Sequence, residues 1–82
     1  MAIVNSIYEL RRDNVLAECV DADERPLHQS QKLERGTELT ILRGPHHWGN
    51  IKRLEYTTVQ IGNKYFNVPA RVLARSIVPK NR

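Results

Sequence analysis

Polar and apolar residues alternate most regularly in two β-rich runs of the C-terminal half, residues 56–61 and 64–69. The runs flank Gly62–Asn63, and both residues of this pair tolerate the positive φ angles of a two-residue hairpin turn. Alternation with a period of two places every second side chain on one face of a strand. We therefore expect a hairpin whose inner face carries Val59, Ile61, Phe66 and Val68. The opposite, solvent-facing side then carries Tyr56, Thr58, Gln60, Tyr65 and Asn67.

Shorter patterns predict the strands before this hairpin. The apolar run Val15–Val20 has the length of a strand, and it precedes a long loop that begins with the acidic stretch 21–24. Residues 37–42 also alternate, and they stop at the breakers Gly44–Pro45, so they form a second strand. Residues 50–61 are expected to form one longer strand that is bulged in the middle.

Proline guides the prediction for the chain after the hairpin. Pro69 begins a helical turn without cost, because the first turn of a helix makes no use of the N–H that proline lacks. We expect one turn over residues 69–73, a closing strand over 76–78 and a basic tail over 79–82. Residues 1–12 are expected to be an N-terminal extension, in which capping-box spacing and a short apolar pattern leave a helix and a strand both open.

The order of these elements resembles the SH3-like barrel family over residues 13–79. The resemblance rests on five short strands, a long loop after the first, a tight late hairpin and a helical turn before the last strand. Two local segments also carry it, the strand entry Leu33–Thr37 and the turn Val68–Leu73. It implies a mostly β fold, a small SH3-like half-open barrel of about five strands with one short helical turn near the C-terminus. Such barrels host many unrelated functions, so the fold class alone does not identify one.

Length and composition restrict the class of protein further. The chain is expected to form a single domain, residues 1–82, with one small core. The inward-facing apolar residues that we expect in this core are Val15, Leu39, Ile41, Val59, Ile61, Phe66, Val68 and Leu73. Cys19 has no second cysteine to pair with, which favours a reducing compartment, the cytoplasm. No apolar run approaches the roughly 20 residues of a membrane span, and the N-terminus lacks the pattern of a signal peptide, so no membrane association is expected.

Charge is distributed unevenly along the chain. The net charge is +4, but residues 1–40 contain 5 basic and 8 acidic residues, whereas residues 41–82 contain 8 basic and 1 acidic residue. Basic side chains neutralise phosphates, and exposed aromatic rings stack on unpaired bases. We therefore expect a non-catalytic domain that binds nucleic acid through a basic, tyrosine-bearing face of its C-terminal half. The expected contact residues, for nucleic acid or another partner, are Arg43, Trp48, Lys52, Arg53, Tyr56, Lys64, Tyr65, Arg71 and Arg75.

The segment 44–50 has the most unusual composition, because it holds the only tryptophan and two of the three histidines. Trp48 is expected either to cap one end of the barrel core or to anchor a partner. The neighbours His46 and His47 are poor joint ligands for one ion, so we expect no metal site and no cofactor. No nucleophile lies in a recognisable catalytic motif, and no glycine-rich phosphate loop precedes a helix, so we expect no enzyme activity.

A second class of function suits the same sequence. A small inhibitor or adaptor, of the kind that phages and mobile elements encode, would dock on a larger protein through the acidic stretch 21–24 and the Trp48 loop. Such a role requires no recognisable sequence motif. The free strand edges of a half-open barrel would also allow two copies to pair, so a homo-oligomer belongs to this class. The sequence leaves both classes open.

Overall fold

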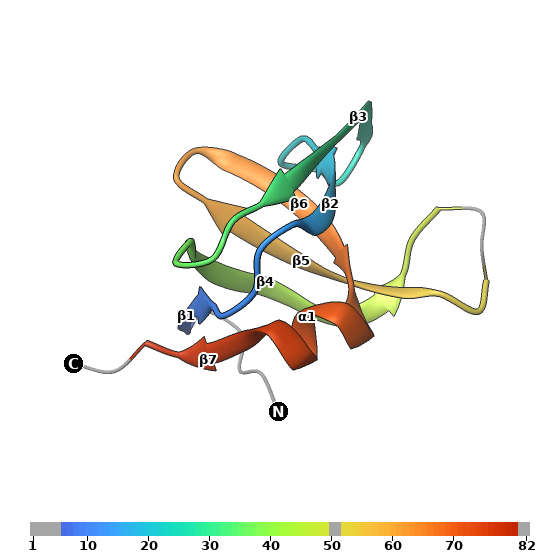
Figure 1. The fold of residues 1–82 in the computed structure, drawn as a ribbon. Coiled ribbons are helices and arrows are strands. Elements are labelled where there is room, and N and C mark those ends of the chain that lie inside the picture. Colours follow the sequence, from blue (N-terminus) through green and yellow to red (C-terminus); the bar gives the residue numbers. More distant parts are fainter. Residues whose placement is uncertain (1–5, 50–51, 81–82) are drawn as a thin grey trace.

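Strands dominate the computed structural model of the chain, which describes residues 6–49 and 52–80 (Figure 1). In chain order the elements are β1 (Ile7–Leu10), β2 (Val15–Val20), β3 (Pro26–Leu33), β4 (Glu38–His47), β5 (Glu55–Ile61), β6 (Lys64–Pro69), α1 (Ala70–Ser76) and β7 (Ile77–Pro79). The strands pair antiparallel in one open sheet with the order β3-β2-β6-β5-β4-β1-β7. The prediction of a mostly β fold with one short helix is confirmed. The described strands number seven, more than the five expected.

The β5–β6 hairpin has the register that the alternation predicts. Ile61 lies opposite Lys64, and Val59 lies opposite Phe66. The turn between the strands places Gly62 at a φ of +61°, which glycine adopts without the steric cost that a Cβ would bring. A two-residue turn fixes which residues of the two strands face each other, so the local sequence determines this part of the fold.

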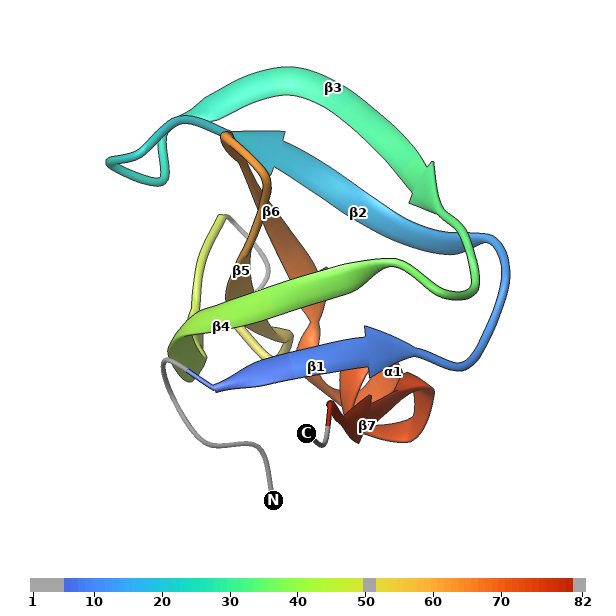
Figure 2. The same cartoon turned by 90° about the vertical axis from the view of Figure 1, so that its left-hand side faces the viewer.

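The sheet curls so that one of its faces encloses the core. In Figure 2, β2 and β3 arch over one side, β1 and β4 cross the other side, and β5 and β6 connect the two. α1 lies at one end of the curl beside β7 (Figure 1), and its buried residues are Leu73 and Ser76. This arrangement places the start of α1 next to the start of β5, because Pro69 at the end of β6 pairs with Tyr56.

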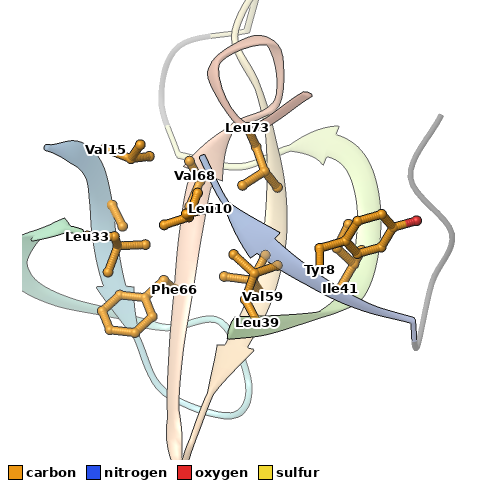
Figure 3. Packing of buried hydrophobic residues seen from close by; sticks show 11 residues of the cluster. Tyr8, Leu10, Val15, Leu33, Leu39, Ile41, Val59, Phe66, Val68 and Leu73 are labelled. Carbon is orange, nitrogen blue, oxygen red and sulfur yellow. The ribbon is translucent and has the colours of Figure 1, made fainter. Parts of the chain in front are cut away.

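Apolar side chains from both halves of the chain meet inside the curl (Figure 3). The buried cluster consists of Tyr8, Leu10, Val15, Ala17, Leu33, Leu39, Ile41, Val59, Phe66, Val68 and Leu73. Every predicted core residue is among them except Ile61, which is half-buried and packs against the cluster. The sequence analysis missed Tyr8, Leu10 and Leu33, because they belong to two strands that it had not assigned.

One prediction for the N-terminal half needs correction, and one open alternative is resolved. Residues 26–33 form β3 where a long loop was expected, and only the short turn 21–25 separates β3 from β2. β3 is an edge strand whose side chains are exposed except for Leu33, so no alternation marked it in the sequence. Residues 7–10, where a helix and a strand were both open, form β1, which lies between β4 and β7.

Three element boundaries were also wrong. β4 continues through Gly44–Pro45 to His47, because register shifts in its pairing with β5 accommodate the missing N–H of the proline. β5 begins only at Glu55, after a turn at residues 52–53, and the rest of the expected long strand, residues 50–51, lies outside the described residues. α1 has seven residues instead of a single turn.

Candidate functional site

The two tyrosines expected to share one surface lie at opposite ends of the β5–β6 hairpin. Tyr56 pairs with Pro69, and Tyr65 pairs with Gln60. Four residues of strand separate Tyr56 from Gln60, which corresponds to about 13 Å at ~3.3 Å per residue. Lys64 is the neighbour of Tyr65 at the turn end of the hairpin. The predicted binding surface is therefore divided into two parts.

Basic side chains gather at the Tyr56 end. Arg53 and Arg71 line the same surface hollow of about 410 Å³, together with Glu55 and its neighbours. Arg75 follows Arg71 by one turn of α1, so the two arginines share a face of the helix. Lys52 precedes Arg53 and is exposed. We call Lys52, Arg53, Arg71 and Arg75 the α1 basic surface.

One further cation adjoins this surface, and the sequence analysis did not include it. The backbone N–H of Arg11 donates to the carbonyl of Ser76 at 2.6 Å, which brings Arg11 to the C-terminal end of α1. The Arg11 side chain is exposed. Only the pairing of β1 with β7 brings these segments together, so no local pattern could have revealed it.

Among the described residues, the cations at this end form no ion pair. Within residues 6–49 and 52–80, ion pairs join carboxylates to Arg43, His46, His47 and Lys80. None of them involves Arg11 or a member of the α1 basic surface. An unpaired guanidinium or ammonium group in water is available to an incoming anion without first losing an ion pair.

Arg43 is engaged elsewhere, with the turn that connects β2 to β3. Its Nη1 lies 3.0 Å from Oε2 of Glu24, and the other carboxylate oxygen, Oε1, lies 2.7 Å from Nε2 of His46. The His46 ring is nearly buried, with 9% of its side chain exposed. Arg43 was predicted as a contact residue for nucleic acid or another partner, and the structure shows its side chain, which is 60% exposed, in an ion pair with Glu24.

Both ring nitrogens of His46 face acceptors. Nδ1 lies 2.7 Å from the carbonyl oxygen of Gly44, and Nε2 faces the Glu24 carboxylate. A carbonyl oxygen has no proton to give, so Nδ1 donates to it. The ionised carboxylate of Glu24 is likewise only an acceptor, so Nε2 donates as well. Both ring nitrogens of His46 are therefore engaged, one with the backbone of β4 and one with the turn.

The electrostatics of Glu24 agree with this assignment. Partial burial by itself would raise the pKa of the Glu24 carboxyl, but hydrogen bonds from His46 and Arg43, together with the attraction of their charges, outweigh it. The net pKa of Glu24 is lowered from its ordinary value of 4.5. Near neutral pH the turn therefore presents a carboxylate to the Arg43 guanidinium and the His46 ring.

Two side chains expected on the solvent face are instead buried beneath this network. The hydroxyl of Thr58 donates to Oδ1 of Asn67 and lies 3.4 Å from Nε2 of His46. Thr58 is 4% exposed and Asn67 0%. Nδ2 of Asn67 is buried without a hydrogen-bond partner among the described residues. The prediction of a solvated face was wrong here because the turn 21–25 and the end of β4 lie over it.

Trp48 belongs to the same assembly. Its indole N–H donates to the backbone carbonyl of Glu24 at 2.8 Å, and its ring meets that of Tyr56 edge to face, with centroids 5.1 Å apart and planes at 75°. Trp48 is half-buried and lies outside the hydrophobic core cluster. Burial and the nearby charge of Glu18 raise the pKa of the Tyr56 hydroxyl above 10.0, so Tyr56 stays neutral at physiological pH.

The Tyr65 end has a different character. Tyr65 and Lys64 line an open groove of about 370 Å³ with Cys19, Leu27 and Phe66. The groove has apolar walls and one cation from the predicted set. Its chemistry differs from that of the α1 basic surface, where arginines predominate.

The described residues contain neither a cluster of metal ligands nor a membrane-spanning helix. In the part of the chain that the structure describes, no group of three or more His, Cys, Asp or Glu side chains is placed to hold a metal ion. No helix within these residues is long and apolar enough to cross a membrane. Comparison with protein-family models, with curated proteins and with solved structures finds no match to this chain.

Proposed function

We propose that this chain is a non-catalytic domain that binds single-stranded nucleic acid with the α1 basic surface and the aromatic pair beside it. The observation that carries the proposal is the meeting of Arg53 and Arg71 at one hollow, with Arg75 one helical turn away and no ion pair to any of them within residues 6–49 and 52–80. Arginine donates several N–H groups in a planar fork that matches a phosphate, so this grouping suits a polyanion.

The aromatic pair supplies the second element of such a surface. Tyr56 pairs with Pro69, the residue directly before α1, and Trp48 packs against Tyr56. Aromatic rings beside a basic surface stack on unpaired bases, and each stacked base contributes about 1 to 3 kcal/mol. Phosphate contacts to the arginines and base contacts to the rings would occur at the same end of the molecule.

The test is the binding of a fluorescein-labelled oligothymidylate of about 12 nucleotides, followed by anisotropy at two salt concentrations, about 50 and 200 mM. Affinity should fall steeply with salt. The double variant Arg53→Ala/Arg71→Ala should bind more weakly, and the slope of log K against log salt should fall by about 1.4, because each lost phosphate contact removes about 0.7 in a single strand.

Matched controls separate the two ends of the hairpin. Lys64→Ala removes the same charge as Arg71→Ala but at the Tyr65 end, so its effect on affinity should be smaller. Tyr56→Leu should weaken binding with the salt slope kept, whereas Tyr65→Leu should leave affinity within about twofold of the parent. Absence of binding at the lower salt concentration, or equal effects at both ends, would contradict the proposal.

A protein partner is the alternative, and one observation favours it. β3 is an eight-residue edge strand with one backbone edge unpaired among the described strands, and it carries the exposed Leu27, at 50% exposure, beside the exposed Leu16 of β2, at 51%. Free edges accept a further strand from another protein or a second copy. An affinity capture that retains a stoichiometric protein, or a dimer in light scattering, combined with no oligonucleotide binding, would favour this alternative.

The interpretation of the fold as an SH3-like half-open barrel also stays a proposal. The hairpin β5–β6, the helix α1 after it and the closing strand β7 support it, as does the open curl of the sheet. A cytoplasmic location is likewise inferred from the lone Cys19. Because such barrels serve many functions, the binding proposal rests on the surface rather than on the fold.

A further inference from the structure

Three donors from one short stretch of chain converge on Glu24. Arg43 and His46 each donate to one oxygen of its carboxylate, at 3.0 and 2.7 Å, and the Trp48 indole donates to its backbone carbonyl at 2.8 Å. A guanidinium, an imidazole ring and an indole N–H are groups that proteins use to hold an oxyanion. His46 lies in β4, and Trp48 directly follows the last residue of that strand, so one residue separates these two donors.

The surroundings of these donors resemble a prepared site more than a chance surface contact. His46 is 9% exposed and is fixed by its second hydrogen bond to Gly44. Behind it lies buried Thr58, and then Asn67, which is fully buried and whose Nδ2 has no partner among the described residues. A buried amide donor without an acceptor is rare and costs stability. With the turn in place, this buried layer therefore still has a hydrogen-bond donor without a partner among the described residues.

Hydrogen bonds and ion pairs hold the turn that fills the site. Oδ1 of Asp21 accepts the backbone N–H groups of Asp23 and Arg25, at 2.8 and 2.9 Å. No residue between 21 and 25 is buried, and Glu24 has a φ of +63°, which is unfavourable for a residue with a Cβ. Such a conformation persists only while its surroundings hold it, so the turn can leave the site without disturbing the hydrophobic core.

We propose that Arg43, His46 and Trp48 form an oxyanion site that Glu24 of the same chain occupies, so that the turn 21–25 competes with a phosphate of the bound nucleic acid. This inference rests on the proposed function, because the site connects to the end of the molecule where α1 begins. Trp48 contacts Tyr56, and Tyr56 pairs with Pro69, the residue before α1. Displacement of the turn would give the bound nucleic acid a further phosphate contact. It would also free the Trp48 indole N–H from its hydrogen bond to the Glu24 carbonyl.

The first test uses inorganic phosphate and needs no nucleic acid. Glu24→Gly removes the carboxylate and relieves the positive φ, and it leaves Arg43 and His46 in place. Phosphate, compared with chloride at equal ionic strength, should raise the melting temperature of Glu24→Gly more than that of the parent, and it should shift the Trp48 indole N–H resonance. Glu24→Gly/His46→Gln should lose this response. An equal response of parent and Glu24→Gly would overturn the oxyanion site.

The second test measures the competition with the labelled oligothymidylate. If the turn occupies the site in most molecules, apparent affinity is reduced by the fraction of molecules in which the site is free. Removal of the Glu24 carboxylate raises that fraction, and we expect Glu24→Gly to bind about tenfold more tightly than the parent. Asp23→Gly is the matched control, because it removes an equal charge and a side chain from the same turn, and no hydrogen bond or ion pair joins the Asp23 side chain to β4 within the described residues. It should change affinity only slightly.

The outcomes separate the two proposals. If the parent binds the oligonucleotide and both glycine variants bind alike, the competition is wrong and the proposed function stands. If phosphate stabilises Glu24→Gly but no protein binds the oligonucleotide, the oxyanion site stands, whereas its nucleic-acid occupant and the proposed function are both wrong. If Glu24→Gly does not fold, Glu24→Gln replaces it in both assays, since a neutral side chain of the same size gives up the site more readily than a carboxylate.

Discussion

The two faces of the β5–β6 hairpin are both covered, and the chemistry that covers them differs. On the inner face, Val59, Phe66 and Val68 are buried in an apolar cluster that the curl of the sheet encloses. On the outer face, Thr58 and Asn67 are buried beneath His46 and the turn that carries Glu24. The inner contacts are non-directional, whereas each outer contact needs a donor and an acceptor in place, and the contacts to the Glu24 carboxylate also involve a charge.

This difference suggests a division of roles. Burial of apolar area stabilises a fold without involving a charged group, and loss of one large side chain affects the whole domain. A network of ion pairs and hydrogen bonds contributes less net free energy, because its groups give up water to form it. The outer face is therefore the part of the hairpin that an anion or a change of pH can open while the inner face stays intact.

The largest expected effect is on the inner face. Phe66→Ala should reduce the free energy of unfolding by about 3 to 5 kcal/mol, since it leaves a cavity in a small core. Urea unfolding followed by circular dichroism measures this change. Ile61→Ala is the control on the same face, and it should cost clearly less because Ile61 is only half-buried. Equal losses in the two variants would show that the core is not centred on Phe66.

A smaller effect is expected in the buried layer of the outer face. Thr58→Val removes the hydroxyl that donates to Asn67 and leaves the amide oxygen of Asn67 unsatisfied, so it should cost about 1 to 3 kcal/mol. The double variant Thr58→Val/Asn67→Leu replaces both partners by apolar groups, and it should lie within about 1 kcal/mol of the parent. Urea unfolding of the three proteins gives the comparison. A double variant less stable than the single one would show that the layer contributes stability through contacts beyond this pair.

The smallest expected effect is the dependence of stability on pH at Glu24. Its pKa in the folded chain is lowered from 4.5, so the carboxylate contributes stability that is present above pH 4.5 and is lost as the pH falls through the folded value. Glu24→Gln should remove this part of the acid dependence, and Asp23→Asn should keep it. Unfolding curves recorded between about pH 3 and pH 7 test this. Equal acid sensitivity of the parent and Glu24→Gln would contradict the role of the carboxylate.

The alternation of polar and apolar residues predicted the structure well wherever residues close in sequence also pair in the sheet. The register of β5 with β6 and the burial of Val59, Phe66 and Val68 follow from the period-two alternation and a two-residue turn. β3 escaped prediction for a physical reason: it is an exposed edge strand, and only a strand with one face in the core needs alternating side chains. The same alternation placed Thr58 on the outer face correctly but could not show what covers that face.

The candidate site was predictable only in part. Charge counting found Arg53, Arg71 and Arg75, which the fold brings to one end, and it also included Arg43, which the fold pairs with Glu24. Arg11 joins the group through a single backbone contact near the end of α1. A count of charges along the chain contains no information on which carboxylate each cation will meet.

The sequence by itself determined the β class, the central hairpin and the apolar residues that face inward, because these depend on contacts between residues a few positions apart. Only the tertiary structure decided that Arg11 reaches the end of α1 and that Glu24 reaches His46. Both outcomes depend on how the sheet curls and on which strands lie side by side. The curl and the strand order depend on the burial of apolar area over the whole chain, and they cannot be predicted from any single segment.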